Sequence, residues 1–170
     1  MIKSYCKINL SLKVLKKMKS GLHDIQTNSF LLNLHDQISV RKLDKKKDVV
    51  IFKGKFKKMV KNSKNSLCET LSLLRKKKLI KSSAYYKIIV NKKIPVFSGL
   101  GGGTSNAAFL IKHLLNKKLN QKILNIFEKK IGSDLRLFFY KQTFQKNLKT
   151  LINYKKKFNF YFLLVYPNVI

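Results

Sequence analysis

Cysteine is scarce in this 170-residue sequence, and its scarcity excludes two kinds of protein. The two cysteines, Cys6 and Cys68, lie far apart, with no Cys-x-x-Cys pair and no histidine at ligand spacing. This pattern excludes a zinc-binding module and a disulfide-stabilised scaffold. Two separate thiols are compatible with a reducing compartment, so we expect a cytoplasmic protein.

Long apolar runs are also missing. Lys3, Lys7 and Lys13 interrupt any apolar leader, and no run approaches the roughly 18 apolar residues that a membrane span needs. Hydrophobic residues still make up 45% of the chain, which is enough for one globular domain with a core. We therefore expect a soluble domain with no membrane partner.

Acidic residues are few, and arginine is rare. Seven Asp and Glu stand against 38 Lys and Arg, which gives a net charge of +31. Such a charge suggests a polyanionic partner, and a basic RNA-associated module is one hypothesis. Only Arg41, Arg75 and Arg136 are arginine, however, whereas nucleic-acid surfaces favour its planar fork. The lysines are spread over every segment, as an AT-rich coding background would produce, so we predict no nucleic-acid partner.

Strand and helix patterns are intermixed along the chain, which predicts an α+β domain. The residues between 24 and 34 have no clear period. Asp44, Asp48 and Glu128 lie beside lysines and are predicted to be solvated surface charges. Apolar alternation or short apolar runs predict strands, and a period near 3.6 predicts helices. The predicted strands are residues 2–14, 37–41, 49–52, 85–90 and a buried strand over 160–166; the predicted helices begin near residue 65, after Gly103, and near residue 120.

Glycine is concentrated in one stretch, residues 94–108, where four of the seven glycines fall within five positions directly before a helical pattern. Glycine backbones can approach a ligand closely, and the N-terminus of the following helix attracts anions, so the stretch predicts a phosphate-binding loop. No lysine follows Gly103, which excludes a Walker A motif, and Thr104 holds the third glycine position of the dinucleotide fingerprint. The alternative is a turn whose Thr or Ser only caps the helix.

Two charged residues stand apart from the lysine-rich background. Asp134 follows Gly132 and Ser133 and precedes an apolar segment, so its carboxylate is a candidate for the edge of a cleft; a helix cap is the alternative. Lys7 lies in an apolar-alternating segment, where it shares a strand face with Asn9. The alternative is that Lys7 lies on the solvent-exposed face of a half-exposed strand.

Four blocks in a fixed order resemble the superfamily of galactokinase, homoserine kinase, mevalonate kinase and phosphomevalonate kinase. The nearest resemblance is to the 4-diphosphocytidyl-2-C-methyl-D-erythritol kinase family of the non-mevalonate isoprenoid pathway, and it covers essentially the whole chain. The glycine block is typical of the superfamily, and the first two blocks select the family. The blocks are residues 7–12 (Lys-Ile-Asn-Leu-Ser-Leu), 21–27 (Gly-Leu-His-Asp-Ile-Gln-Thr), 95–108, and 132–134 (Gly-Ser-Asp).

The resemblance implies a fold, a reaction and two cofactors. The fold is α+β of the ribosomal-protein-S5 domain 2-like type, a mixed sheet with helices on one side. The reaction is ATP-dependent phosphorylation of the 2-hydroxyl of 4-diphosphocytidyl-2-C-methyl-D-erythritol. ATP would carry Mg²⁺, with Thr104 or Ser105 as a hydroxyl partner and no direct protein cage. The partners are therefore small molecules, and no oligomeric state is predicted.

The resemblance also implies site residues. Lys7 and Asp134 match the catalytic lysine and aspartate, and Asn9 and His23 match positions near the cytidine-bearing substrate. Residues 65–70 would lie near the nucleotide. Leu22 stands where the family has a tyrosine before the histidine. The residues implied to wrap the ATP phosphates are Pro95, Val96, Phe97, Ser98, Gly99, Leu100, Gly101, Gly102, Gly103, Thr104 and Ser105.

The end of the chain is assigned by the same resemblance. Residues 1–152 are expected to form the ATP-binding N-terminal domain, and residues 153–170 the first strand of a second domain into which family members continue. The chain is thus expected to be truncated relative to the family. The alternative to an active kinase is an inactive kinase fragment.

Overall fold

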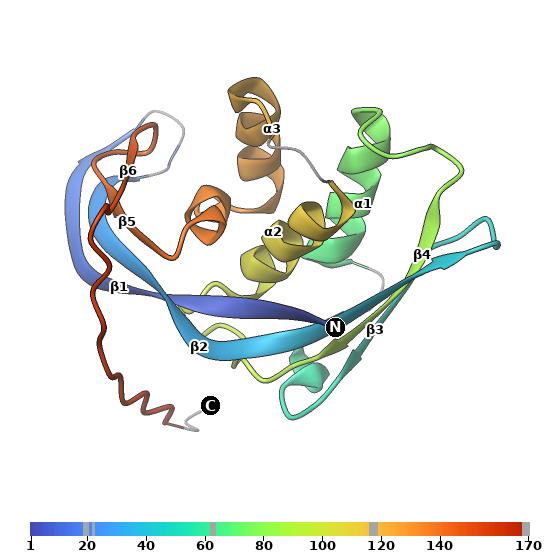
Figure 1. Ribbon diagram of the computed structural model, residues 1–170, viewed down its shortest axis with the longest axis horizontal. Helices are drawn as coiled ribbons and strands as arrows, with labels where there is room; N and C mark the ends of the chain where they lie inside the picture. Colours follow the sequence, from blue (N-terminus) through green and yellow to red (C-terminus); the bar gives the residue numbers. More distant parts are fainter. Residues whose placement is uncertain (19–20, 22, 62–63, 116–118, 168–170) are drawn as a thin grey trace.

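The computed structural model describes residues 1–18, 21, 23–61, 64–115 and 119–167. It is an α+β domain in which all three α-helices cover one face of a six-stranded mixed sheet (Figure 1). The predicted fold class is therefore confirmed. None of the described helices is long and apolar enough to span a membrane.

One long strand organises the sheet. β2 (His23–Leu43) pairs antiparallel with β1 (Ile2–Lys17) along nearly its whole length. On its other edge, residues 37–43 pair with β4 (Tyr85–Asn91) and residues 27–30 pair with β5 (Gln142–Gln145). β5 in turn pairs antiparallel with the short strand β6 (Leu151–Asn153). The 24–34 region, which has no clear period in the sequence, is thus strand.

The parallel part of the sheet is a β-α-β crossover. β3 (Val49–Lys53) runs parallel to β4, and the connection between them contains the 3₁₀ turn η1 (Lys57–Met59) and helix α1 (Ser66–Lys76). A parallel pair needs such a crossover because its strands start at the same end. β4 then leads directly into the glycine-rich loop and helix α2 (Gly102–Leu114).

The core lies between the sheet and the helices. Helix α3 (Gln121–Ile131) and the 3₁₀ segment η2 (Leu135–Phe139) complete the helical layer, in which Phe127 and Phe138 are fully buried. A second apolar cluster joins the sheet to α1 and α2 through side chains such as Ile38, Leu71 and Leu110. The strand before the glycine-rich loop, β4, and the helix after it, α2, are therefore both packed into the core.

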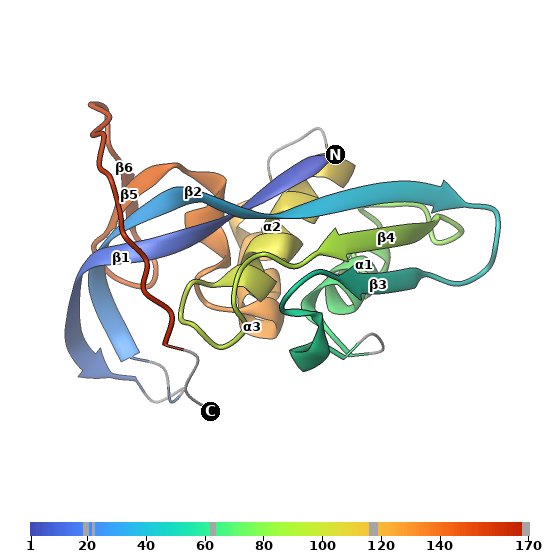
Figure 2. The ribbon, with the colours of Figure 1, turned by 90° about the horizontal axis from the view of Figure 1, so that it is seen from below.

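The segment after β6 differs from its prediction. Residues 157–167 have neither helix nor strand, and Tyr161, Leu163 and Val165 are at least 80% exposed, so the prediction of a buried strand over 160–166 is wrong. The alternate side chains do contact the domain, since the Phe160 ring packs on Phe30. Figure 2 shows the segment running along the outer surface of the domain. An apolar run becomes a buried strand only when a neighbouring strand and a covering layer are present. The assignment of residues 153–170 to a second domain stays a prediction.

Two acidic side chains predicted to be solvated are in ion pairs. Asp48 accepts two hydrogen bonds of 2.7 Å from Arg75 and one of 2.9 Å from the backbone N–H of Tyr86. Glu128 accepts two from Arg136, at 2.9 and 2.5 Å. Burial raises the pKa of Glu128, and the Arg136 guanidinium opposes that rise. The sequence does not reveal either ion pair. Each acidic residue has lysines beside it, whereas its arginine partner lies at least eight residues away in the sequence.

Candidate active site

The glycine-rich loop forms one wall of a cavity of about 670 Å³. The opposite wall is built from η1, the residues after it and the start of α1. The N-terminus of α2 forms the floor, and Asp134 lies at the edge. Nine of the eleven residues predicted to wrap the ATP phosphates line this cavity: Pro95, Val96, Phe97, Ser98, Gly99, Gly101, Gly102, Gly103 and Thr104.

The backbone of the loop adopts the left-handed conformations that its glycines permit. Gly99 and Gly101 have φ angles of 75° and 69°, and Phe97, with φ of 62°, adopts the same region while its side chain is 87% exposed. A Cβ on Gly101 would lie 2.7 Å from the Phe138 ring and 3.0 Å from an Asp134 carboxylate oxygen. Only glycine therefore allows the loop to pass this close to Asp134.

The start of α2 is open where the other two α-helices are capped. Asn65 accepts hydrogen bonds from Leu67 and Cys68 at the start of α1, and Asn120 accepts one from Ile123 at the start of α3. The N-cap of α2 is Gly101, which has no side chain. The first N–H groups of a helix have no intrahelical partner, so those of α2 are available to an anion in the cavity. Thr104 and Ser105 lie inside the helix, which contradicts the capping alternative.

Two of the eleven predicted loop residues face away from the cavity. Ser105 is fully buried and donates a 2.5 Å hydrogen bond to the Tyr5 carbonyl of β1, so the prediction that it binds Mg²⁺ or phosphate is not supported by its geometry. The Leu100 carbonyl accepts a 3.1 Å hydrogen bond from the Lys7 N–H. Both residues anchor the loop to β1. Of the two hydroxyls proposed for Mg²⁺, only that of Thr104 lines the cavity.

Lys7 and Asp134 lie next to two consecutive residues of the loop, Leu100 and Gly101 respectively. Lys7 is 8% exposed; its backbone contacts Leu100, and its ammonium donates to the Asn9 carboxamide at 3.3 Å. The predicted shared face of Lys7 and Asn9 is thus confirmed. Asp134 borders Gly101 and Gly132, and its side chain caps no described backbone group. Three ion pairs occur in the described part of the chain, and none joins Lys7 to Asp134.

His23 lies apart from the other predicted site residues. It pairs with Lys17 at the far end of the hairpin, whereas Asn9 pairs with Ser29. Ser29 and His23 are six positions apart on the strand, which at the usual rise corresponds to about 20 Å along β2. The exposed His23 ring is therefore not part of the cavity. Leu22, which stands where the family has a tyrosine, lies outside the described residues.

The structure adds residues that local sequence patterns do not single out. The apolar side chains of Phe52, Met59 and Val60 line the cavity on the β3–η1 side, and Asn65 and Ser66, from the segment predicted to lie near the nucleotide, line it at the start of α1. The amide of Asn106 also lines the cavity; it is 2% exposed, and its Oδ1 has no partner among the described residues. Within the described ranges, no three His, Cys, Asp or Glu side chains are grouped closely enough to hold a metal ion.

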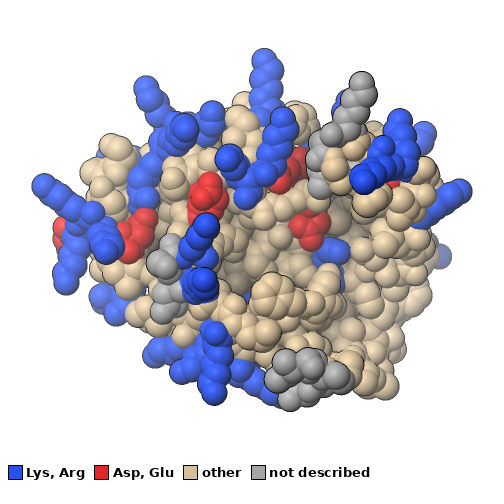
Figure 3. Space-filling model, turned by 180° about the vertical axis from the view of Figure 1, so that it is seen from behind, with Lys and Arg blue, Asp and Glu red and all other residues tan. Residues whose placement is uncertain are grey.

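A ligand pair of adenine nucleotide and Mg²⁺ fits these surroundings. The cavity offers an apolar wall for a base, uncapped helix N–H groups for phosphates, and the Thr104 hydroxyl beside them. Two lysines, Lys61 and Lys64, lie on the cavity wall, and Lys92 lies beneath the loop. Figure 3 shows that lysine and arginine side chains project all around one face, with few acidic side chains among them.

Comparison with known proteins agrees with this geometry. Residues 64–140 match the family model "GHMP kinases N terminal domain". These residues form a GHMP kinase N-terminal domain. The matched range contains α1, β4, the glycine-rich loop, α2 and Asp134, and so includes most of the residues that line the cavity.

Curated relatives extend the likeness over nearly the whole chain. The 4-diphosphocytidyl-2-C-methyl-D-erythritol kinase of Pelagibacter ubique is 35% identical over 180 residues, which covers 98% of this chain and 60% of the relative. The enzyme of the same name from Buchnera aphidicola is 33% identical over 175 residues, covering 98% of this chain and 59% of the relative. This chain thus spans about 60% of the length of these relatives.

Solved structures confirm the fold. A crystal structure of 4-(cytidine 5'-diphospho)-2C-methyl-D-erythritol kinase superimposes with a TM-score of 0.63 at 22% identity, covering 89% of this chain and 54% of that one. A crystal structure of mevalonate kinase gives a TM-score of 0.59 at 18% identity, covering 91% of this chain and 55% of that one. The arrangement of sheet, loop and helices is therefore that of GHMP kinases.

Proposed function

We propose that this chain is the nucleotide-binding part of a kinase that transfers the γ-phosphoryl group of ATP to the 2-hydroxyl of 4-diphosphocytidyl-2-C-methyl-D-erythritol. The names of the curated relatives support the acceptor. The observation that carries the proposal is the uncapped start of α2, which opens into the cavity with Asp134 beside Gly101. We further propose a cytoplasmic location, which fits the scarcity of cysteine and the wide separation of Cys6 and Cys68 in the sequence.

In this proposal the cavity positions the nucleotide. The base would lie against the apolar side chains near η1, and the phosphates would accept hydrogen bonds from the first N–H groups of α2. Mg²⁺, held by the ATP phosphates and the Thr104 hydroxyl, would neutralise phosphate charge. Phosphoryl transfer gains most of its rate from such positioning and charge stabilisation, and little from covalent help by the protein.

Asp134 and Lys7 would act on the acceptor. An ionised carboxylate beside the loop can accept the hydroxyl proton as the new P–O bond forms. The Lys7 ammonium would steady the incoming oxygen through its positive charge. Their side chains have no mutual ion pair, so in this proposal the acceptor lies between them.

The deciding experiment measures ADP release with 4-diphosphocytidyl-2-C-methyl-D-erythritol as the acceptor. We expect acceptor-dependent turnover, and a fall of at least about 100-fold in kcat for Asp134→Asn and for Lys7→Ala, the size typical of a lost acid–base group. Asp44→Asn, an exposed charge in the β2–β3 turn, is the matched control and should leave turnover unchanged.

The outcomes separate the alternatives. A folded chain that binds ATP but shows no acceptor-dependent turnover would be an inactive kinase fragment. A chain that binds no ATP but binds RNA, with an affinity that falls broadly as lysines are neutralised or salt is raised, would be a basic RNA-associated module.

A further inference from the structure

Asp36, on β2, is a fully buried carboxylate with contacts to three consecutive residues. Its Oδ1 accepts hydrogen bonds from the backbone N–H groups of Lys93 at 2.8 Å and Ile94 at 2.9 Å, and its Oδ2 is paired with the ammonium of Lys92. A buried carboxylate is tolerated only when its oxygens are satisfied in this way. Asp36 thereby fixes the last residues of the chain before the glycine-rich loop.

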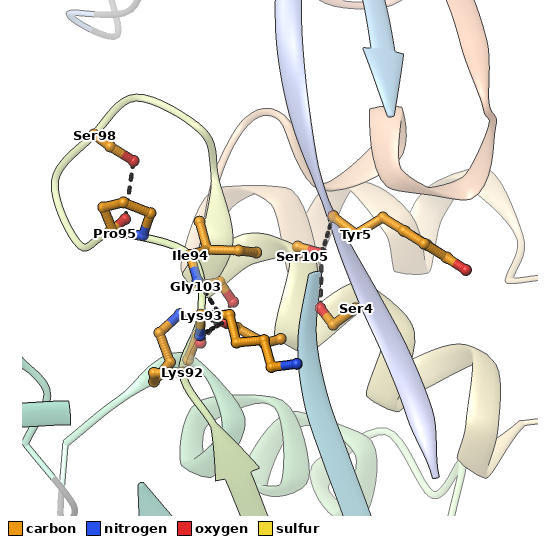
Figure 4. Close-up of polar contacts among 11 residues, drawn as sticks. Ser4, Tyr5, Lys92, Lys93, Ile94, Pro95, Ser98, Gly103 and Ser105 are labelled. Atoms are coloured by element: carbon orange, nitrogen blue, oxygen red, sulfur yellow. Dashed lines mark hydrogen bonds and ion pairs between the residues drawn. The ribbon is translucent and has the colours of Figure 1, made fainter. Parts of the chain in front are cut away.

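Ser4, on β1, fixes the other end of that loop. Because the single hydroxyl hydrogen of Ser105 goes to the Tyr5 carbonyl, Ser4 is the donor in the 2.8 Å contact between the two serine hydroxyls. Ser4 and Asp36 are direct partners in the β1–β2 register. Figure 4 shows Lys92, Lys93 and Ile94 where the chain enters the loop, and Ser4, Tyr5 and Ser105 grouped together beside β1. One cross-strand pair therefore holds both ends of the loop.

Lys92 connects this pair to the phosphate-binding part of the cavity. Its side chain is 4% exposed and lies against the first turn of α2, where a Cβ on Gly102 would be 3.2 Å from the ammonium nitrogen. The same Cβ would be 3.1 Å from the Ile94 side chain. The position of the first α2 turn thus depends on where Asp36 holds Lys92 and Ile94.

We propose that Asp36 is a positioning residue that, together with its cross-strand partner Ser4, preforms the glycine-rich loop for nucleotide binding. The inference rests on the nucleotide-binding part of the proposed function. Preformed N–H groups bind phosphate more tightly because no ordering cost is incurred on binding. Asp36 does not itself line the cavity. In this proposal it acts through Lys92 and the backbone of residues 93 and 94.

The sign of the effect distinguishes positioning from simple electrostatics. Replacing Asp36 by Asn removes a negative charge near an anion site, which by charge alone would tighten nucleotide binding. If Asp36 positions the loop, the same change weakens binding, because an Asn Nδ2 cannot accept from Lys92 and the ammonium must move. The two readings thus predict opposite changes in affinity.

The experiment compares Asp36→Asn with Asp48→Asn by calorimetric titration with MgATP. Asp48 is a suitable control because it also accepts from a cation and from a backbone N–H, but it lies away from the cavity. We expect Kd to rise by about 10-fold or more for Asp36→Asn and to stay within about 2-fold for Asp48→Asn at a temperature where both are folded. Unchanged or tighter binding by Asp36→Asn would overturn the proposal.

Hydrogen exchange in the unliganded chain gives a test that does not depend on the ligand. We expect the amides of residues 96–104 to exchange about 10-fold faster in Asp36→Asn than in Asp48→Asn. If the wild type binds no MgATP, the proposed function fails and exchange alone decides the inference, which equal rates in the two variants would refute. If Asp36→Asn does not fold, Ser4→Ala replaces it, with Ser11→Ala on the exposed part of β1 as control, and the same contrast is required.

Discussion

The two halves of the β1–β2 hairpin share strands but differ in what covers them. In the first half, Ile38 is buried beneath α1 and α2, and Cys6 and Leu32 are buried against Ile94 beside the glycine-rich loop. In the second half, Leu10, Leu12 and Val14 are 42%, 58% and 56% exposed. The strand sequence is apolar in both halves, so the cover supplied by the helices and the glycine-rich loop, and not the strand pattern, decides which half belongs to the core.

This difference separates two parts of the proposed site. The loop attaches to the covered half through Lys7, Tyr5 and Asp36. Asn9 lies where the cover ends, and His23 lies at the far end of the exposed half. The phosphate-binding geometry is thus supported by the core, whereas Asn9 and His23, the two residues implied to lie near the cytidine-bearing substrate, are not. Nucleotide affinity and acceptor affinity should accordingly respond to different substitutions.

The largest expected effect is on stability in the covered half. Ile38→Ala removes three methyl or methylene groups from a fully buried position between the sheet and the helices, and we expect a loss of about 3–4 kcal/mol in the free energy of unfolding. Urea denaturation followed by circular dichroism measures it. A loss below about 1 kcal/mol would show that the covered half is not the tightly packed region described above.

A smaller effect should follow when the loop is altered where it meets Asp134. Gly101→Ala introduces a methyl group 2.7 Å from Phe138 at a φ of 69°, so we expect a loss of about 2–3 kcal/mol in stability or in MgATP binding. Gly99→Ala is the matched control: its φ of 75° is equally left-handed, but no atom lies within 4 Å, and backbone strain alone costs about 1 kcal/mol. Equal losses in both variants would contradict a close approach at Gly101.

Alkaline pH should weaken the covered half through Cys6. Burial raises the pKa of its thiol from 9.0 to about 11, so the unfolded chain ionises first and the fold loses stability as pH rises from 9 towards 11. We expect the wild type to lose about 2 kcal/mol more than Cys6→Ala between pH 8 and pH 11. Urea midpoints of both proteins at the two pH values measure the difference. Parallel pH dependence would show that the thiol is not buried.

The smallest effect is expected in the exposed half. Leu12→Ala removes a side chain that is already 58% exposed, and we expect a change within about 0.5 kcal/mol. The same urea experiment used for Ile38→Ala makes the comparison direct. A loss above about 2 kcal/mol would indicate that something covers this half in solution.

Much of the fold could be predicted because its signals are local. The apolar period predicted a helix near residue 65 and another after Gly103, and these are α1 and α2. The first part of β2 could not be predicted because Thr27 and Ser29 are polar yet buried in the sheet. The run 160–166 was misread because hydrophobicity does not reveal whether a partner strand is present.

The same limit applies to the site. Clustered glycines and a helical pattern next to them indicate the loop, the sequence surroundings of Lys7 and Asp134 mark them as candidates, and the resemblance implies their catalytic roles. Asp36 and Lys92 could not be found in this way, because they lie 56 residues apart and Lys92 is one lysine among many. Ser105 was assigned to the cavity by its place in the motif, whereas the turn of α2 directs its hydroxyl to β1. Sequence patterns do not determine whether a side chain in the first turn of a helix points into the cavity or towards the sheet.

The hydrogen bond between Ser4 and Ser105 joins residues 101 positions apart, and this separation bears on how the domain assembles. The entropy cost of closing a chain segment grows with its length, so contacts between neighbouring strands form before contacts of this span. The β1–β2 hairpin can therefore exist while the loop still has only one fixed end. By this argument the anion site is completed only after the hairpin has formed, and a nucleotide that binds only the completed loop favours the folded state by mass action.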